Sequence, residues 1–554
     1  LLHTYDRSGN FVTAAELDAH MELYPTKDGL YLYDSYDIAL YRLGSDGASL
    51  TEVWKAAPDS DYRLLQVYED AVYLCDSSYA YALDLDSGEA SPLFRWDSFG
   101  ILRCDAFYRL RDGAFFVYSM LNSTSPYRLL LPAGESGAQR QELIFAINDP
   151  DLYGENSIYS MYADAIRDFN DTNAAYFITV KNYSECSSPQ TLLNADIAAK
   201  GGPDLVELSH FSPELISPEK CEDLMPYLEK DPELSPDALL PGPLALLQTD
   251  GQLLSMVPSF YVNTLVCAAQ ELPEGGLGGY PELLSLNGGE KTLLGVSCSR
   301  QELLYYAFAQ NRRNYSADEI AAILELASAL PEAAESGRSD ILSGERLFEI
   351  AKIAYPITAG LSQGGLAGVA EERLYFGADI AMPGLPAAGG CFPMLTPVQE
   401  LILPKNAANK EGAWEFIKFV LTQRYQLGLS GYKNGIPILN DAFNAGFAYA
   451  EDWIKTYGTV PANFGGNDYV ITDDRDSRQF WELANSVGAI LRGEDELCLT
   501  VYSLANEYFA GKKSLSDASG DIASRLNIYF SERDCPLPGE ICLVSAGLSN
   551  SMSS

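Results

Sequence analysis

The sequence predicts an α/β chain preceded by an all-β segment of short repeated strands. Two observations carry this prediction. Strand and helix patterns alternate between residues 142 and 208, and a tyrosine-rich strand motif recurs about every 41 to 42 positions in the first 130 residues. Since 554 residues exceed what one hydrophobic core usually holds, we expect two to four domains.

The α/β stretch is the organising segment. Apolar and β-branched runs predict strands at 143–147, 176–180 and 204–208, with helices between them at 158–169 and 189–200. The first helix has apolar residues at three- and four-residue spacing on one face: Ile158, Met161, Tyr162, Ala165, Ile166 and Phe169. Such alternation is typical of a parallel sheet, whose ligands bind beyond the carboxyl ends of the strands. The loops 148–155, 182–189 and 209–213 are therefore expected to surround one crevice.

The repeat in the first 130 residues predicts small antiparallel units. A turn followed by a tyrosine-rich strand recurs at 28–33, 69–74 and 111–118. A period near 40 with four short strands per unit is typical of propeller blades, and three and a half blades cannot close a ring. A sandwich of β-meanders is the alternative interpretation. The small polar residues 132–141 indicate a linker into the α/β part.

The remaining chain is interpreted as a second α/β unit with a helical C-terminal cap. Extended segments are expected at 252–258, 259–266, 373–382 and 400–403. Helices are expected at 222–228, 235–248, 299–311, 316–330, 344–352, 409–422, 476–491, 499–510 and 514–530.

Composition excludes several classes of function. The net charge of −40 opposes binding to nucleic acid and to anionic lipid, because both are negatively charged. The ten cysteines lack the dense spacing of a disulfide scaffold; Cys535 and Cys542 are either a disulfide or two free thiols. No apolar run approaches the ~20 residues that cross a bilayer. The first residue is leucine, so we expect a removed leader.

Catalytic and metal-binding motifs are missing from the sequence. There is no H-E-x-x-H, G-x-S-x-G or phosphate-binding loop motif, and only three histidines occur. We therefore predict no catalytic residue, metal or cofactor. A glycosidase with paired carboxylates remains an alternative, because it requires no further motif. His210 follows the third strand and either contacts a ligand or bonds within its own loop.

The predicted crevice combines aromatic and small polar residues. Such a surface suits a neutral polyhydroxylated ligand, because sugar C–H faces stack on rings while hydroxyls meet polar groups. The candidate ligand-binding residues are Asp149, Asp151, Tyr153, Tyr183, Ser209, His210, Phe211, Ser259, Tyr261 and Asn263. For each aromatic residue, packing in the core is an equally good explanation.

The order and spacing of several sequence segments are informative; the segments lie at 162–170, 193–206, 222–228, 250–253, 412–419, 434–438, 507–511 and 525–529. Together they resemble the extracellular solute-binding proteins of ABC importers, in the sugar-type family 1. The resemblance covers most of 142–532. The propeller-like extension before it departs from the family pattern.

This resemblance implies a two-lobed periplasmic-binding-protein-like α/β fold of type II, and the sequence repeats predict the all-β partial propeller-like domain that precedes it. The implied domains are 1–131, a linker at 132–141, lobes at 142–532 that cross near 255–270 and 375–400, and a tail at 533–554. It also implies a carbohydrate ligand, a membrane permease as partner and an extracellular, lipid-anchored location. Contacts from the second lobe are placed at Tyr355, Gly384 and Tyr432.

Two other functions remain open. One is a carbohydrate-active enzyme that uses paired carboxylates. The other is a cell-surface interaction or sensor module in which the β-rich repeats bind a protein or a cell-wall glycan.

Overall fold

The structure is a computed structural model. It describes residues 2–16, 20–26, 29–57, 60–68, 71–96, 99, 101, 104–120, 126–132, 140–151, 157–184, 186–294, 298–334, 338–356, 366–428, 431–432, 434–457, 475–493 and 495–532. The chain divides into two compact units. The first contains Leu1–Ile144 and Asp149–Lys181, and the second contains Phe145–Asn148 and Asn182–Ser554.

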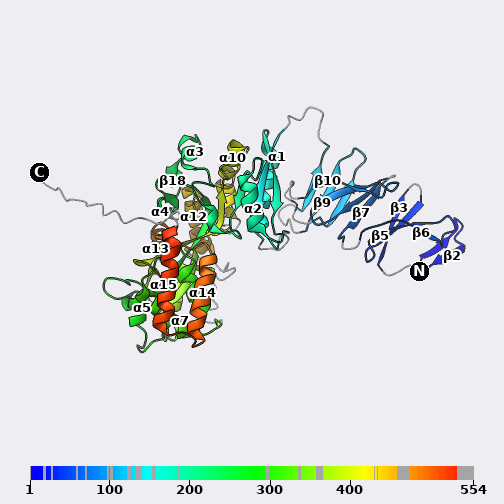
Figure 1. The fold of residues 1–554 in the computed structure, drawn as a ribbon. Coiled ribbons are helices and arrows are strands. Elements are labelled where there is room, and N and C mark those ends of the chain that lie inside the picture. Colours follow the sequence, from blue (N-terminus) through cyan, green and yellow to red (C-terminus); the bar gives the residue numbers. More distant parts are fainter. Residues whose placement is uncertain are drawn as a thin grey trace. The chain divides into compact units, whose positions relative to one another are not determined.

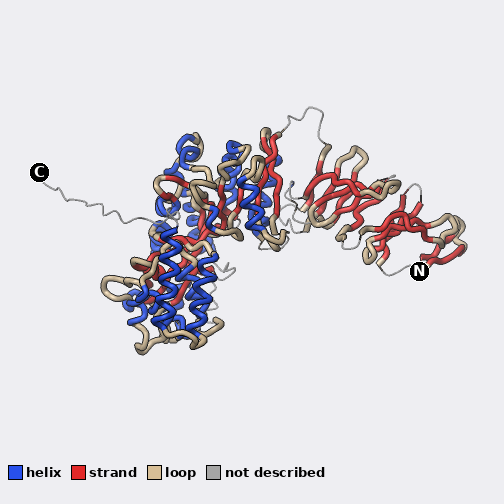
Figure 2. Tube along the Cα trace, in the orientation of Figure 1, coloured by secondary structure: helices blue, strands red, loops and turns tan. Residues whose placement is uncertain are grey.

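The N-terminal part of the first unit consists of small antiparallel sheets (Figures 1 and 2). They are a two-stranded sheet, two four-stranded sheets and a three-stranded sheet. Their strands are β1 (Leu2–Tyr5), β2 (Phe11–Ala15), β3 (Met21–Thr26), β4 (Gly29–Asp34), β5 (Ala39–Leu43), β6 (Leu50–Lys55), β7 (Arg63–Tyr68), β8 (Ala71–Cys75), β9 (Tyr79–Leu83), β10 (Ala90–Arg95), β11 (Ala106–Arg109), β12 (Phe115–Tyr118) and β13 (Tyr127–Leu130).

The recurring sequence motif corresponds to one structural position. It forms β4, β8 and β12, which are each the second strand of a sheet along the chain and are each paired on both sides. A strand with a neighbour on each side must bury its backbone groups in the ladder, and its β-branched and aromatic residues pack on the sheet faces. The predicted antiparallel units are therefore present, four-stranded in two sheets.

A larger mixed sheet organises the rest of the chain. Its order is β15-β14-β16-β24-β19-β20-β21, with strands β14 (Gln141–Ile147), β15 (Tyr176–Asn182), β16 (Leu205–Glu207), β19 (Met256–Ala268), β20 (Glu349–Tyr355), β21 (Leu366–Gly368) and β24 (Met394–Ile402). β14 and β16 are parallel, as the sequence predicts, whereas β24 runs antiparallel to both β16 and β19. Three further strands pair with its central strands: β22 (Ile380–Ala387) and β27 (Ile436–Pro437) with β19, and β28 (Ala489–Ile490) with β24.

Two hydrophobic cores in the second unit lie along strands β19 and β24 of this sheet. One core contains Ala146, Val206, Leu254 and Ile402, near the start of β19 and the end of β24. The other contains Leu265 and Cys267 of β19 and Met394 of β24, at the opposite ends of the same strands. β24 therefore passes from one core to the other, and β19, which begins two residues after Leu254 of the first core, runs antiparallel beside it into the second.

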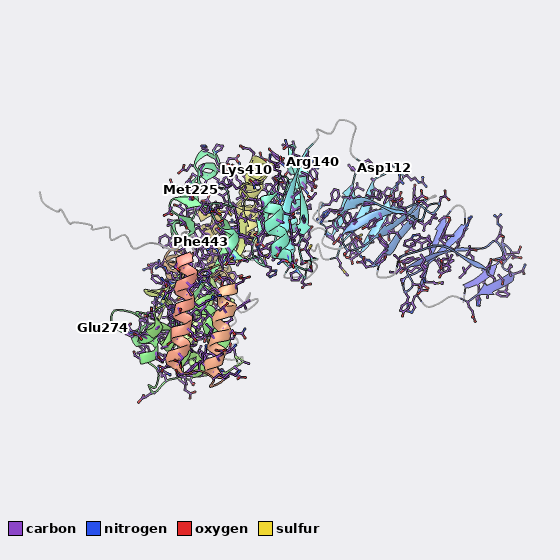
Figure 3. All side chains as sticks on the ribbon, viewed as in Figure 1. Asp112, Arg140, Met225, Glu274, Lys410 and Phe443 are labelled. Carbon is purple, nitrogen blue, oxygen red and sulfur yellow. The ribbon has the colours of Figure 1, made fainter. Side chains whose placement is uncertain are left out.

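Helices surround the sheet, as Figure 2 shows in blue. They are α1 (Ile158–Thr172), α2 (Pro189–Ala198), α3 (Met225–Lys230), α4 (Pro241–Leu247), α5 (Tyr280–Ser285), α6 (Arg300–Phe308), α7 (Ala317–Ser328), α8 (Ser339–Leu342), α9 (Val369–Phe376), α10 (Lys410–Val420), α11 (Gln423–Gln426), α12 (Asn440–Tyr457), α13 (Arg475–Asn485), α14 (Glu496–Phe509) and α15 (Leu515–Glu532). Met225 of α3 and Lys410 of α10 are labelled in Figure 3.

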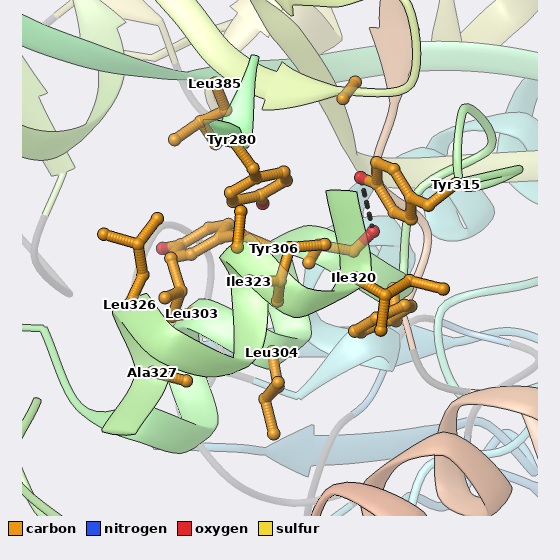
Figure 4. Close-up of a cluster of buried hydrophobic side chains, with 14 of the residues drawn as sticks. Tyr280, Leu303, Leu304, Tyr306, Tyr315, Ile320, Ile323, Leu326, Ala327 and Leu385 are labelled. Carbon is orange, nitrogen blue, oxygen red and sulfur yellow. Dashed lines mark hydrogen bonds between the residues drawn. The ribbon is translucent and has the colours of Figure 1, made fainter. Parts of the chain in front are cut away.

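Local sequence signals explain several of these helices. Ser299 and Ser316 each form a capping box, with Glu302 and Glu319 respectively, at the starts of α6 and α7. On α1 the predicted apolar face is buried, apart from the half-buried Met161. Figure 4 shows part of the second core, in which Tyr280, Tyr306 and Tyr315 lie around the helix that carries Ile320 and Ile323. Amphipathic patterning thus predicted these helices well.

Two segments differ from the sequence prediction. Residues 344–352 were expected to be helical, but Glu349–Tyr355 forms β20 between β19 and β21. Residues 373–382 were expected to be extended, but Arg373 lies in α9, which ends at the left-handed Gly377. Pairing with two neighbouring strands overrides the local preference in the first case. The extended segments 252–258 and 259–266 are largely one strand, β19.

The sequence also led to expectations about disulfide bonds and membrane-spanning helices. The described cysteines are free: Cys75, Cys104, Cys186, Cys221, Cys267, Cys298, Cys391 and Cys498. Cys535, Cys542 and most of the 132–141 linker lie outside the described residues. Within the described part of the chain, no helix combines the length and apolar character that spanning a bilayer requires.

Candidate functional site

The carboxyl ends of β14 and β16 are held together in the second unit by two hydrogen bonds. The Asn148 side chain donates to the His210 carbonyl at 2.7 Å, and the His210 imidazole Nδ1 lies 2.8 Å from the Asn148 carbonyl oxygen. Ser209 and His210 are exposed, and Phe211 is buried. Two of the predicted loops therefore meet at one edge of the sheet, with polar groups facing solvent.

A buried carboxyl group lies directly below this edge. Glu207 accepts hydrogen bonds from the Ser209 hydroxyl at 2.6 Å and from the Ser209 backbone at 3.0 Å. Burial raises the pKa of Glu207 to about 7, against the lowering effect of these hydrogen bonds, and the nearby charge of Glu400 adds to the rise. Ser209 thus acts here as a partner of Glu207.

Buried polar pairs link β19 and β24 in the segment between the two cores, which we call the crossing. Ser259 donates to Gln399 at 2.9 Å, and the Asn263 side chain donates to the Thr396 hydroxyl at 2.7 Å. The ladder between the two strands is irregular on both sides of Ser259. Tyr261 is half-buried between these pairs, and burial raises the pKa of its hydroxyl. The side-chain oxygen of Asn263 has no hydrogen-bond partner among the described residues, so this pair is only partly satisfied, and burying it costs free energy.

A second buried network joins the crossing to the C-terminal segment. Arg492, which follows β28, donates from Nε and one Nη to both carboxylate oxygens of Glu400 at 2.9–3.1 Å. Arg313 pairs with Asp495, the N-cap of α14, and both side chains are buried. Burial alone would raise the pKa of Asp495, but the hydrogen bonds and charge of Arg313 lower it below its ordinary value.

A small cavity lies between these residues. Its volume is about 20 Å³, and it is lined by Pro213, Ile216, Ala309, Gln310, Asn311, Arg313, Ile490, Arg492, Gly493 and Asp495. Pro213 and Ile216 come from the loop after β16, and Ile216 belongs to the first core; Ala309 belongs to the second. The cavity is therefore enclosed by chain segments from both cores.

The remaining candidate residues are placed as follows. Asp149 and Asp151 belong to the first unit, where buried Asp149 accepts from the Tyr159 backbone at 2.9 Å in the first turn of α1. Tyr183 is fully buried in the first core and bonds Asp196 at 2.6 Å. Tyr355 is half-buried in β20, and the Gly384 backbone bonds the Thr264 hydroxyl at 3.0 Å. Tyr153 and the Tyr432 side chain lie outside the described residues.

Sequence reasoning missed the most polar part of this region. Glu207, Glu400, Arg492, Arg313 and Asp495 were not among the candidates. Arg313 and Asp495 are 182 positions apart, and Arg492 and Glu400 are 92 positions apart, so no local spacing reveals the pairs. The one available signal was the position of Asp495 before a helix, which predicts a cap. In the described part of the chain, no cluster of His, Cys, Asp and Glu suits a metal ion.

Comparison with known proteins gives structural likeness only. No family model matches the chain, and no curated protein matches it. The structure is similar to the sugar-binding protein MalE from Xanthomonas citri, at 14% identity over 71% of this chain and 98% of that one, with a TM-score of 0.44.

Two further similar structures are of the same kind. A family 1 extracellular solute-binding protein from Bifidobacterium longum subsp. infantis has 13% identity over 72% of this chain and all of its own (TM-score 0.40). The maltose/maltodextrin-binding domain MalE from Bdellovibrio bacteriovorus, bound to maltotriose, has 12% identity over 71% and 100% (TM-score 0.38). The three structures are named respectively for binding a sugar, a solute, and maltose or maltodextrin.

Proposed function

We propose that the chain is an extracellular solute-binding protein that captures a neutral polyhydroxylated ligand, a sugar or oligosaccharide, and releases it unchanged to the membrane permease of an ABC importer. The observation that carries the proposal is that β24 passes from one hydrophobic core to the other, with β19 paired beside it and leading from Leu254 of the first core into the second. Two cores joined by a pair of strands can close around a ligand by hinge motion, and a ligand shifts such an equilibrium through contacts made in the closed state only.

The irregular ladder near Ser259 supports a hinge at the crossing. Register irregularities lie between Met256 and Ser259 and between Ser259 and Phe260, near the start of β19. A bulge interrupts regular pairing and bends the strand locally, so backbone angles can change there at small cost. The buried pairs Ser259–Gln399 and Asn263–Thr396 keep the two strands in register on either side.

The chemistry of the crossing favours a neutral ligand. Arg492 and Arg313 are both neutralised by buried carboxylates, so neither offers a free positive charge to an anion. The exposed Ser209 and His210 and the half-buried Tyr261 supply hydroxyl, imidazole and phenol groups. These groups suit sugar hydroxyls and C–H faces. The ligand-contacting set proposed from the second unit is Ser209, His210, Phe211, Ser259, Tyr261, Asn263, Tyr355, Gly384 and Tyr432.

The proposed location and partner follow from the same interpretation. A protein that delivers solute to a permease has to remain at the outer membrane surface, for which we propose a lipid anchor at the N-terminus. The net charge of −40 opposes direct adsorption to anionic lipid, which favours a covalent anchor over adsorption. We propose that the N-terminal sheets form propeller-like units and act as a scaffold for the binding unit.

Calorimetric titration of the full chain tests the proposal. The panel contains glucose, maltose, maltotriose, cellobiose and xylobiose, with a tripeptide and zinc chloride as controls. We expect at least one sugar to bind with micromolar or tighter affinity and to reduce the radius of gyration in solution scattering. Binding of the tripeptide or zinc in place of every sugar would contradict the proposal. Chromatography of each sugar after overnight incubation separates binding from hydrolysis, since an enzyme would leave products.

A further inference from the structure

The cavity between the two cores carries unpartnered polar atoms. Gln310, Asn311 and Arg313 are 2%, 6% and 3% exposed, and all three line it. Among the described residues, Gln310 Oε1, Asn311 Nδ2 and Arg313 Nε have no hydrogen-bond partner. A buried polar group without a partner costs free energy, so three beside one cavity require an explanation.

The orientation of each amide is fixed by its other hydrogen bonds. Gln310 donates through Nε2 to the Pro386 carbonyl at 3.3 Å and to the Tyr315 hydroxyl at 2.8 Å, so its oxygen is the unpartnered acceptor. Asn311 accepts through Oδ1 from the Ile490 backbone at 2.9 Å, so its amide nitrogen is the unpartnered donor. Exchanging nitrogen and oxygen in either amide would set two acceptors or two donors against each other.

These atoms match one chemical group. Two donors and one acceptor are what a single hydroxyl requires, because its oxygen accepts two hydrogen bonds and its hydrogen donates one. A carboxylate oxygen would face the Gln310 acceptor without a proton, and an ammonium group could not accept from Asn311 or Arg313. A volume of about 20 Å³ holds one group the size of a water molecule.

The surroundings of the cavity also select against charge. The guanidinium of Arg313 is matched by Asp495, and that of Arg492 is matched by Glu400. Pro213 and Ile216 form an apolar wall, which can contact the C–H groups that accompany a hydroxyl. The charged residues that line the cavity are therefore paired, and the hydrogen-bond donors and acceptor that remain without a partner suit one neutral hydroxyl.

We propose that this cavity is a hydroxyl-binding subsite, formed by Gln310, Asn311 and Arg313, that receives one hydroxyl of a neutral polyol ligand. The subsite rests on the proposed function only for the identity of the ligand that carries the hydroxyl. Because the cavity is lined from both cores, a bound hydroxyl also contributes contacts that depend on how the cores are arranged.

The first test is a crystal structure of the full chain grown without sugar or polyol. We expect an ordered water within hydrogen-bond distance of Gln310 Oε1, Asn311 Nδ2 and Arg313 Nε. A structure in which these residues are ordered and the water is absent, or touches only one of them, overturns the proposal. This test does not depend on whether the protein binds sugars.

The second test uses Asn311→Asp, which keeps the acceptor for the Ile490 backbone and replaces the donor with a charged acceptor. The exposed Asn287→Asp carries the same charge change outside the cavity. For the tightest-binding sugar of the panel, we expect Asn311→Asp to weaken binding at least about tenfold and Asn287→Asp to leave it unchanged. One monodeoxy analogue should bind the wild-type protein and Asn311→Asp equally, because the hydroxyl that meets Asn311 is missing.

The two proposals fail in different ways. If sugars bind and Asn311→Asp binds them as tightly as the wild-type protein, the subsite is wrong and the proposed function stands. If no sugar binds but the crystal contains the triply bonded water, the subsite stands as a hydroxyl site and the sugar function is wrong.

Discussion

Arg492 and Glu400 form a buried ion pair with three hydrogen bonds of 2.9–3.1 Å. Their side chains are 9% and 4% exposed. Glu400 lies in β24, close to the first core, and also accepts from the Ser255 hydroxyl at 2.6 Å. Arg492 follows β28 and lines the cavity between the cores. The pair therefore ties the C-terminal segment to a strand that serves both cores.

Arg492→Met should lower the free energy of unfolding by about 3 kcal/mol or more. Removing one member of a buried pair leaves the other charge without compensation, and such changes typically cost 3–5 kcal/mol. The matched control is Lys55→Met, which breaks an exposed pair with Asp37 and should destabilise the protein far less than Arg492→Met. Urea denaturation followed by circular dichroism measures both.

The double variant Glu400→Gln/Arg492→Met separates charge from packing. Since no buried charge is left behind, we expect it to be more stable than Arg492→Met alone. A double variant that is less stable than Arg492→Met would show that the Glu400 carboxylate stabilises the fold through other partners, such as the Ser255 hydroxyl.

Glu207 should make stability fall as the pH rises. Its pKa is raised from 4.5 to about 7 on folding, so the folded state binds a proton more tightly than the unfolded state. The resulting stabilisation is fully present below pH 4.5 and is lost as the pH rises through 7; its size is about 3 kcal/mol. We expect the stability of the wild-type protein relative to Glu207→Gln to fall between pH 4.5 and pH 7.

Burial also raises the pKa of Glu372 to about 7, so stability changes with pH for a second reason in the same range. That contribution is the same in both proteins and cancels in the difference. Glu274→Gln, at an exposed loop position labelled in Figure 3, should leave the pH dependence unchanged. A constant difference between wild-type protein and Glu207→Gln across this range would contradict the shift.

Much of the fold could be predicted, because its signals are local. Ser299 and Ser316 are caps that a reader of the sequence can identify, and the buried face of α1 repeats at helical spacing. β20 was missed because Glu349–Tyr355 becomes a strand through its neighbours β19 and β21 and not through its own residues.

For the candidate site, the sequence predicted where loop 209–211 lies along the fold but not the hydrogen-bond partners of the side chains around it. The loop 209–211 was expected at the carboxyl end of a strand, and it does follow β16 beside Asn148. The side-chain roles depend on partners far away in the sequence, such as Arg492 for Glu400. Tyr183 illustrates the limit: an aromatic residue at a strand end packs in the core as readily as it faces solvent.

Gly384→Ala should destabilise the protein by about 3 kcal/mol or more. A Cβ at this position would lie 2.1 Å from the Phe392 carbonyl carbon, and φ is +93°, where side chains are unfavourable. In the turn that follows β22, Gly389 has φ +86°, but a Cβ there would have no heavy atom of the described residues within 4 Å. Gly389→Ala should cost only about 1–2 kcal/mol. Equal thermal shifts for the two variants would show that the close approach does not matter.

Asn148→Ala should weaken sugar binding several-fold while lowering the free energy of unfolding by about 1 kcal/mol. The side chain of Asn148 holds the His210 carbonyl at 2.7 Å, and this bond orders the two loops that follow β14 and β16. Ligand binding to the variant has to order these loops first, which reduces affinity. Calorimetry with the tightest-binding sugar measures the effect. Asn440→Ala also removes an amide bonded to two backbone carbonyls, those of Asp237 and Leu239, and should leave affinity unchanged. Equal affinity of Asn148→Ala and wild-type protein would place the ligand away from this edge of the sheet.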